Sequence, residues 1–139
     1  MSKALERLKN LTAKISSYEV ARKENIKLLE SLYEQPGIAD KVDKFSDLFA
    51  FKAINLSGVS LSDESLGEIQ EGKYLQIIAI IYDKEAKVKN RNISLGYFGR
   101  VEKADPSLVH DIVTCVLRWR FEKSFMTLEH YHNMIGTLK

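Results

Sequence analysis

Hydrophobic side chains recur at steps of three and four residues along the first quarter of the chain, which is the period of an amphipathic helix. The pattern covers residues 3–34 and meets no glycine or proline before Pro36 and Gly37, so we predict one long helix over 3–34. Its narrow stripe occupies the a and d positions of a heptad pattern, at Leu8, Leu11, Ile15, Tyr18, Arg22, Asn25 and Leu29.

A helix of this length extends roughly 45 Å at about 1.5 Å per residue, which is more than one small domain covers along one side. The stripe is also as narrow as the seam of a coiled coil. Arg22 and Asn25 are polar at these positions, which either sets the register of a coiled coil or marks a phase shift on a surface helix. We therefore expect the seven stripe residues to form a homodimer contact.

In residues 74–102 every second side chain forms a face that is apolar at nearly every step, while the other face is polar near the middle and apolar toward the base. This is the period of a half-buried β-strand, and we predict an antiparallel hairpin there. Taking Asn90 and Arg91 as a two-residue turn, Tyr82 faces Gly99 and Ile80 faces Val101. One face of this hairpin is then apolar at nearly every pair, as a sheet packed on a core requires.

Between these elements, residues 38–54 follow a helical period, and we predict a second helix there. The alternative is a strand in which Phe49, Phe51 and Ala53 alternate. The helical period rests on Ile38, Val42, Phe45, Phe49 and Ala53.

After the hairpin, Asp105 and Pro106 form an N-cap followed by proline at the first helical position. We predict a helix from there to about Phe125, apolar over a wide arc that includes Trp119. Thr127 is positioned to cap a last short helix that ends at Gly136.

These elements predict an α+β fold in a single domain, residues 1–139. An isolated two-stranded ribbon is marginally stable in water, so its apolar faces need a cover. The helix at 106–125, a third strand or a second copy of the chain would each provide one.

The composition is that of a soluble globular protein, with 45% hydrophobic and 29% charged residues in 139. The single cysteine, Cys115, excludes a disulfide within the chain and suits a reducing compartment. No secretory signal precedes the first helix, and the apolar run from Ile77 to Tyr82 is too short to span a bilayer. We expect a cytoplasmic protein without a membrane partner.

The net charge of +2 is concentrated on the predicted hairpin, where residues 84–103 carry six basic and two acidic side chains. Such a surface favours an acidic protein or a nucleic acid. Lysines there would also keep strand edges from aggregating without any partner. The candidate partner-binding residues are Lys84, Lys87, Lys89, Arg91, Phe98 and Arg100.

Catalytic and metal-binding patterns are weak. Asp83, Glu85 and Lys87 match the D-x-E-x-K spacing of metal-dependent nucleases, yet a Mg²⁺ site would need a further acid. His130 and His132 are two residues apart on a predicted helix and point to different faces. We expect no metal, no cofactor and a buried, structural Cys115.

The sequence therefore favours a small non-enzymatic binding or regulatory protein that dimerises and occupies a surface on another macromolecule. Inhibitors, immunity proteins, adaptors and phage- or plasmid-encoded factors have this profile. A nucleic-acid-binding regulator that uses the basic hairpin is the alternative, and a metal-dependent nuclease ranks third.

Overall fold

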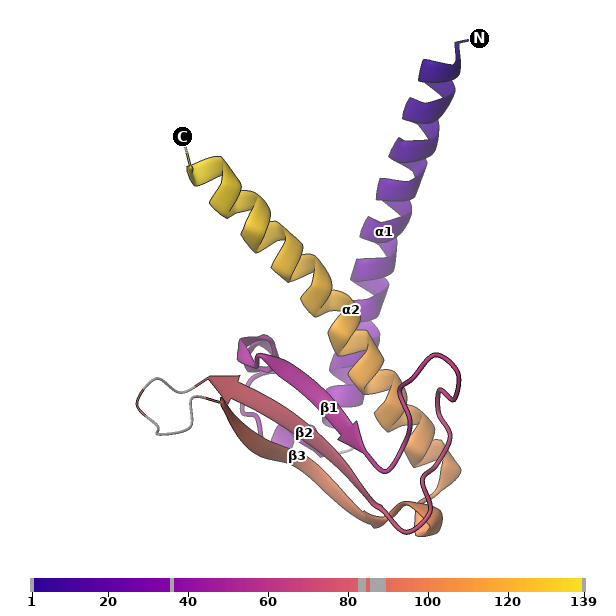
Figure 1. Cartoon of the computed structure of the whole chain (residues 1–139), viewed down its shortest axis with the longest axis vertical. Coiled ribbons are helices and arrows are strands. Elements are labelled where there is room, and N and C mark those ends of the chain that lie inside the picture. Colours follow the sequence, from indigo (N-terminus) through magenta and orange to yellow (C-terminus); the bar gives the residue numbers. More distant parts are fainter. Residues whose placement is uncertain (1, 36, 83–84, 86–89, 139) are drawn as a thin grey trace.

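Two long helices and a three-stranded antiparallel sheet make up the fold (Figure 1). The structure is a computed structural model that describes residues 2–35, 37–82, 85 and 90–138, with only the backbone of residues 14–17. Its order is α1 (Lys3–Glu34), the 3-10 turns η1 (Ile38–Asp40) and η2 (Phe45–Ala50), β1 (Ala53–Ser57), β2 (Tyr74–Tyr82), β3 (Asn90–Arg100), the 3-10 turn η3 (Val101–Lys103) and α2 (Pro106–Thr137). The α+β class is confirmed, and the predicted bounds of the first helix agree with α1.

Both long helices begin at side-chain caps that the sequence encodes. The Ser2 hydroxyl accepts a hydrogen bond from the Leu5 amide at 3.3 Å, and the Asp105 carboxylate accepts one from the Ser107 amide at 2.8 Å. Each cap satisfies an amide at the helix start that has no partner within the helix.

The core lies between one face of the sheet and the two helices. Leu75, Ile77 and Ala79 of β2 are buried on this face, and core residues of α2 and α1 are also buried. Trp119 donates its indole N–H to the Leu48 carbonyl oxygen at 2.8 Å, which ties α2 to η2. The principal core residues are Leu75, Ile77, Ala79, Leu95, Ile112, Val116, Trp119 and Leu29.

The predicted hairpin register is wrong. Ile80 pairs with Asn92 instead of Val101, and Tyr82 pairs with Asn90 instead of Gly99. Asn90 and Arg91 therefore belong to β3 and do not form the turn. The register that we predicted extended the ladder through the charged residues 83–89, whereas the observed one pairs the apolar β2 with residues 90–100. At Ile80 and Tyr82 the shift is an odd number of residues, so the β3 residues in this part of the ladder share a face with the other alternate row of β2.

The predicted second helix is wrong as well. Residues 38–54 form η1, η2 and the start of β1, which pairs antiparallel with β2. The alternative, a strand, is correct from Ala53 onward and incorrect for Phe49, which lies in η2. β1 supplies the third strand, and its residues Ile54 and Leu56 sit opposite Ala79 and Ile77.

The C-terminal region is one helix of 32 residues, so the predicted break near Thr127 is wrong. The Thr127 hydroxyl donates to the Lys123 carbonyl oxygen at 2.8 Å and does not cap a new helix. Serine and threonine hydroxyls inside a helix commonly donate to the carbonyl oxygen one turn earlier. In the interior of a helix these residues are therefore poor markers of a helix start. Gly136 lies within α2.

Gly58 allows the chain to turn from β1 into the long loop before β2. Its φ is +93°, and a Cβ atom there would lie 2.8 Å from the Tyr74 carbonyl oxygen. Only glycine adopts this conformation without strain at such a close approach. The loop that follows carries four acidic residues, Asp63, Glu64, Glu68 and Glu71.

Candidate interaction surfaces

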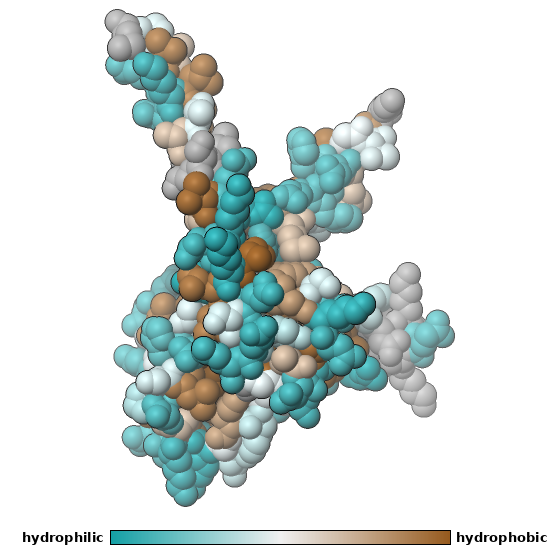
Figure 2. Space-filling view, turned by 180° about the vertical axis from the view of Figure 1, so that it is seen from behind, coloured by the Kyte–Doolittle hydropathy of each residue, from teal (hydrophilic) through white to brown (hydrophobic). Residues whose placement is uncertain are grey.

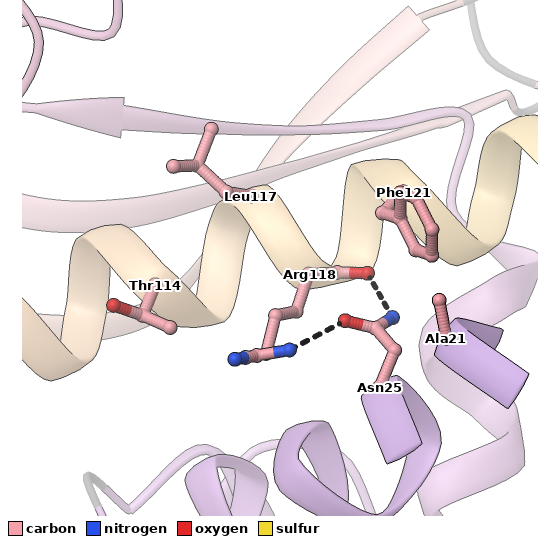
Figure 3. Close-up of a pocket in the computed structure, with 6 residues that line it drawn as sticks. All are labelled: Ala21, Asn25, Thr114, Leu117, Arg118 and Phe121. Carbon is pink, nitrogen blue, oxygen red and sulfur yellow. Dashed lines mark hydrogen bonds between the residues drawn. The ribbon is translucent and has the colours of Figure 1, made fainter. Parts of the chain in front are cut away.

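α1 and α2 cross beside the sheet and are joined there by a reciprocal pair of hydrogen bonds (Figure 3). Asn25 Nδ2 donates to the Arg118 carbonyl oxygen at 2.9 Å, and Arg118 Nη1 donates to Asn25 Oδ1 at 3.0 Å. Asn25 is 4% exposed and Leu29, one turn further along, is fully buried. These contacts attach the second half of α1 to α2 of the same chain.

An ion-pair cluster lies next to this contact, toward the open end of the two helices. Arg22 Nε is 2.7 Å from Glu122 Oε1, and Arg22 Nη1 is 2.5 Å from Glu129 Oε1. The hydrogen bond with Glu122 is the main reason why the pKa of Arg22 lies above its ordinary value. The guanidinium carbon also stands 4.8 Å from the centre of the Phe125 ring, which suits a cation–π contact. Glu122 is only 3% exposed, so removing Arg22 would leave a buried carboxylate without its main partner.

Beyond this cluster the two helices diverge and extend past the sheet (Figure 1). We call residues 3–18 the α1 arm and residues 126–138 the α2 arm. Tyr18 contacts α2 at the point where the two arms begin to diverge, since its ring centre is 5.8 Å from that of Phe125. Past Tyr18 the arms present large hydrophobic side chains to solvent, and Figure 2 shows brown side chains along the α1 arm.

The structure divides the predicted dimer stripe into two parts. Arg22, Asn25 and Leu29 contact α2 within the same chain. The remaining described members, Leu8, Leu11 and Tyr18, are exposed on the α1 arm, and the side chain of Ile15 lies outside the described part. Homodimerisation stays a prediction. Any dimer contact made by the stripe would be confined to the part of it on the α1 arm.

The α2 arm carries a second apolar row that the sequence analysis did not single out as a surface. Leu128, Tyr131, Ile135 and Leu138 are between 58% and 82% exposed. The predicted break near Thr127 hid this row, because it assigned these residues to a separate short helix. The wide apolar arc of α2 was a usable signal, because a helix needs a partner wherever such an arc leaves the core.

A third surface is the face of the sheet opposite the core, which we call the outer sheet face. It is defined by Tyr74, Ile78, Ile80, Tyr82 and Tyr97, whose cross-strand pairing places them on the side away from Leu75 and Ile77. The three tyrosines are exposed, and the rings of Tyr74 and Tyr97 are 5.7 Å apart. The three strands contain Arg91 and Arg100 but no aspartate or glutamate.

The predicted partner-binding residues do not form one patch in the described part of the chain. Arg91 is exposed near the start of β3, whereas Arg100 lies at its other end with Nε 3.1 Å from Glu102 Oε1. Phe98 is half-buried and packs against the core. Lys84, Lys87 and Lys89 lie outside the described residues. The three tyrosines were missed because the predicted register put Tyr82 and Tyr97 on the apolar face of the hairpin, which we expected to pack on a core, whereas they are exposed.

The residues weighed for chemistry are separated from one another. Cys115 is buried, as expected, and burial raises the pKa of its thiol to about 12. His110, His130 and His132 are exposed on α2. Asp83 and Lys87 of the D-x-E-x-K pattern fall outside the described residues. Among the residues that are described, no three histidine, cysteine, aspartate or glutamate side chains are grouped to hold a metal ion.

Within the described residues, neither long helix contains a stretch apolar enough to cross a membrane. Comparisons of the chain with protein families, curated proteins and solved structures find no match in any of the three. The two arms and the outer sheet face are therefore the features of the molecule that bear on its function.

Proposed function

We propose that this chain is a non-enzymatic binding protein that works as a homodimer and occupies a surface on another macromolecule. The observation that carries the proposal is the pair of exposed apolar rows on the α1 and α2 arms. Leu11 is 58% and Ile135 70% exposed, on helices that extend beyond their own core. Contiguous apolar surface of this kind marks an interaction site.

Assembly through the arms leaves the sheet free to meet the partner. The outer sheet face combines three exposed tyrosines with Arg100, which pairs with Tyr74, and its strands carry no carboxylates. Aromatic and arginine side chains carry much of the energy in protein interfaces. This composition supports a partner with an acidic surface, in keeping with the positive charge of residues 84–103.

The assembly is tested by Leu11→Asp, which places a charge in the α1 row and should lower the oligomer mass in light scattering. Val20→Asp is the matched control, because Val20 is 68% exposed and lies about 180° around α1 from Leu11. It should keep the wild-type mass. A wild-type chain that is monomeric at high micromolar concentration, or equal effects of both variants, would contradict the proposal.

The partner surface is tested by the double variant Tyr74→Ser/Tyr97→Ser in a pull-down from the native host. A partner captured by the wild type should be lost in the double variant and kept in Leu66→Ser. Leu66 is similarly exposed but lies in the loop before β2. Capture by the double variant at wild-type yield would rule out the outer sheet face.

The tyrosine pair also favours one second candidate function, the binding of single-stranded nucleic acid. Aromatic side chains on an open sheet face stack bases, and each stacked base contributes about 1–3 kcal/mol. Anisotropy of a labelled oligonucleotide, followed across a salt series, measures this directly. Binding that weakens at least about fivefold in Tyr74→Ser/Tyr97→Ser would support nucleic acid over an acidic protein, because 1 kcal/mol corresponds to about that factor.

A further inference from the structure

The two apolar rows of one chain point in different directions. We define the α1 row as Leu8, Leu11 and Tyr18 and the α2 row as Leu128, Tyr131, Ile135 and Leu138. Each residue of an α-helix advances about 100° around the axis. Leu11 and Leu29 are five full turns apart along α1 and therefore lie on the same side of the helix. The α1 row thus continues the side of α1 that contacts α2.

The α2 row does not face α1 in return. The residues of α2 that contact α1 are Arg118, Glu122, Phe125 and Glu129. At about 100° per residue, the α2 row is centred roughly 130° around the helix from them. The side of the α2 arm nearest α1 instead carries Glu129, which is bound to Arg22. Neither row can therefore cover the other within one chain.

The two rows nevertheless match each other in spacing. With Ile15 counted at its sequence position, the α1 row advances by three, four and three residues, and so does the α2 row from Leu128 to Leu138. Rows of this spacing are the a and d positions of a coiled coil, and two of equal length can pack along their whole extent.

Charge distinguishes the pairings open to two copies. The α1 arm carries four basic residues, Lys3, Arg7, Lys9 and Lys14, against Glu6, a net charge of +3. The α2 arm carries only Glu129, a net charge of −1 with neutral histidines. Two α1 arms in contact would bring like charges together, whereas an α1 arm against an α2 arm would not.

The exposed area is sufficient for such a contact. The side chains of the two rows are 44% to 82% exposed. A large side chain with this exposure presents on the order of 100 Å². The seven described side chains of the two rows then offer roughly 700 Å² per copy, close to the ~800 Å² per partner of a standard interface. A twofold axis would cover all four rows at once, because each copy supplies one row of each kind.

We infer that the α1 arm of one copy packs against the α2 arm of a second copy, and reciprocally, so that the dimer is held by two equivalent seams. This inference rests on the proposed dimer and specifies how it is built. It makes a four-helix assembly from the arms, with the sheets of the two copies outside it.

The test is site-directed cross-linking between two differently tagged forms of the full chain. Leu11→Cys is mixed with Ile135→Cys in one sample and with Tyr131→Cys in another, so that parallel and antiparallel seams are both sampled. The native Cys115 is buried and does not compete. Subunits are allowed to exchange between the two tagged forms. The cysteines are then oxidised to disulfides, and the products are separated by mass. Each variant is first checked by light scattering for wild-type mass.

We expect a covalent heterodimer in at least one mixture, at a yield several times that of the homodimers of the single variants. Val20→Cys in place of Leu11→Cys should abolish it. A dimer by light scattering in which Leu11→Cys links only to itself, or in which neither mixture cross-links, overturns the reciprocal seams while leaving the dimer intact. A monomeric wild type overturns the dimer itself and assigns the rows to another protein.

Discussion

Replacing Asn25 by alanine tests whether the second half of α1 belongs to its own chain. Asn25 is 4% exposed and makes two hydrogen bonds to Arg118 of α2, at 2.9 and 3.0 Å. A neutral hydrogen bond contributes about 1 kcal/mol and one with a charged partner about 1.5–3 kcal/mol. Alanine recovers about 0.5 kcal/mol through its higher helix propensity. The expected loss of unfolding free energy is therefore about 2–3.5 kcal/mol.

The substitution also removes a hydrogen-bond partner from Arg118. Arg118 Nε is already buried without a hydrogen-bond partner in the described part of the chain, and the substitution removes the partner of Nη1 as well. Donors that are left unpaired cost more than the mean value of a hydrogen bond. This places the effect at the upper end of the range.

Urea unfolding followed by circular dichroism measures the change, with an unchanged m-value as the sign that only stability has altered. Asn10→Ala is the matched control, since Asn10 is exposed on the α1 arm and should gain slightly from helix propensity. Asn25→Ala should also keep the wild-type mass in light scattering. A loss below about 0.5 kcal/mol, the size typical of a surface substitution, would refute the intrachain contact, and so would a fall in oligomer mass.

Two further predictions concern the glycines and the thiol. Gly58→Ala should lower the unfolding free energy by about 2 kcal/mol, because φ is +93° and the Cβ would meet the Tyr74 carbonyl, whereas Gly136→Ala should raise it by about 0.5 kcal/mol in thermal unfolding. Equal effects of the two would contradict the structure. Cys115 should resist aromatic disulfide reagents at pH 8 until the protein is unfolded. Because burial raises its pKa from 9.0 to about 12, only the unfolded chain loses the proton in that interval, so stability falls as pH rises from 9 toward 12. Cys115→Ala should lose less stability over the same range.

Local features of the sequence determined the parts of the fold that depend on neighbouring residues. The bounds of α1 follow from the Ser2 cap, an unbroken helical period and the Pro36-Gly37 stop, and the start of α2 follows from Asp105 and Pro106. The burial of Cys115 and Trp119 followed from the apolar arc of their helix. Each of these depends on contacts within about one helical turn, which is the range that a periodic pattern describes.

Tertiary structure decided the rest, because the competing local patterns were nearly equal. Residues 38–54 have a helical period, yet β1 forms there because the apolar β2 needs a second neighbour to bury its ladder. The hairpin register depended on which residues meet Leu75 and Ile77 from across the core, and the alternation of one strand does not specify that choice.

The candidate surfaces divide in the same way. The sequence determined that a narrow stripe runs along α1, but only the packing of Asn25 and Arg22 on α2 showed where the stripe stops being internal. The α2 row was visible as apolar residues and became a surface only when the helix was seen to continue past the sheet. A one-dimensional pattern records which side chains avoid water, and the three-dimensional fold determines which of them its own core can cover.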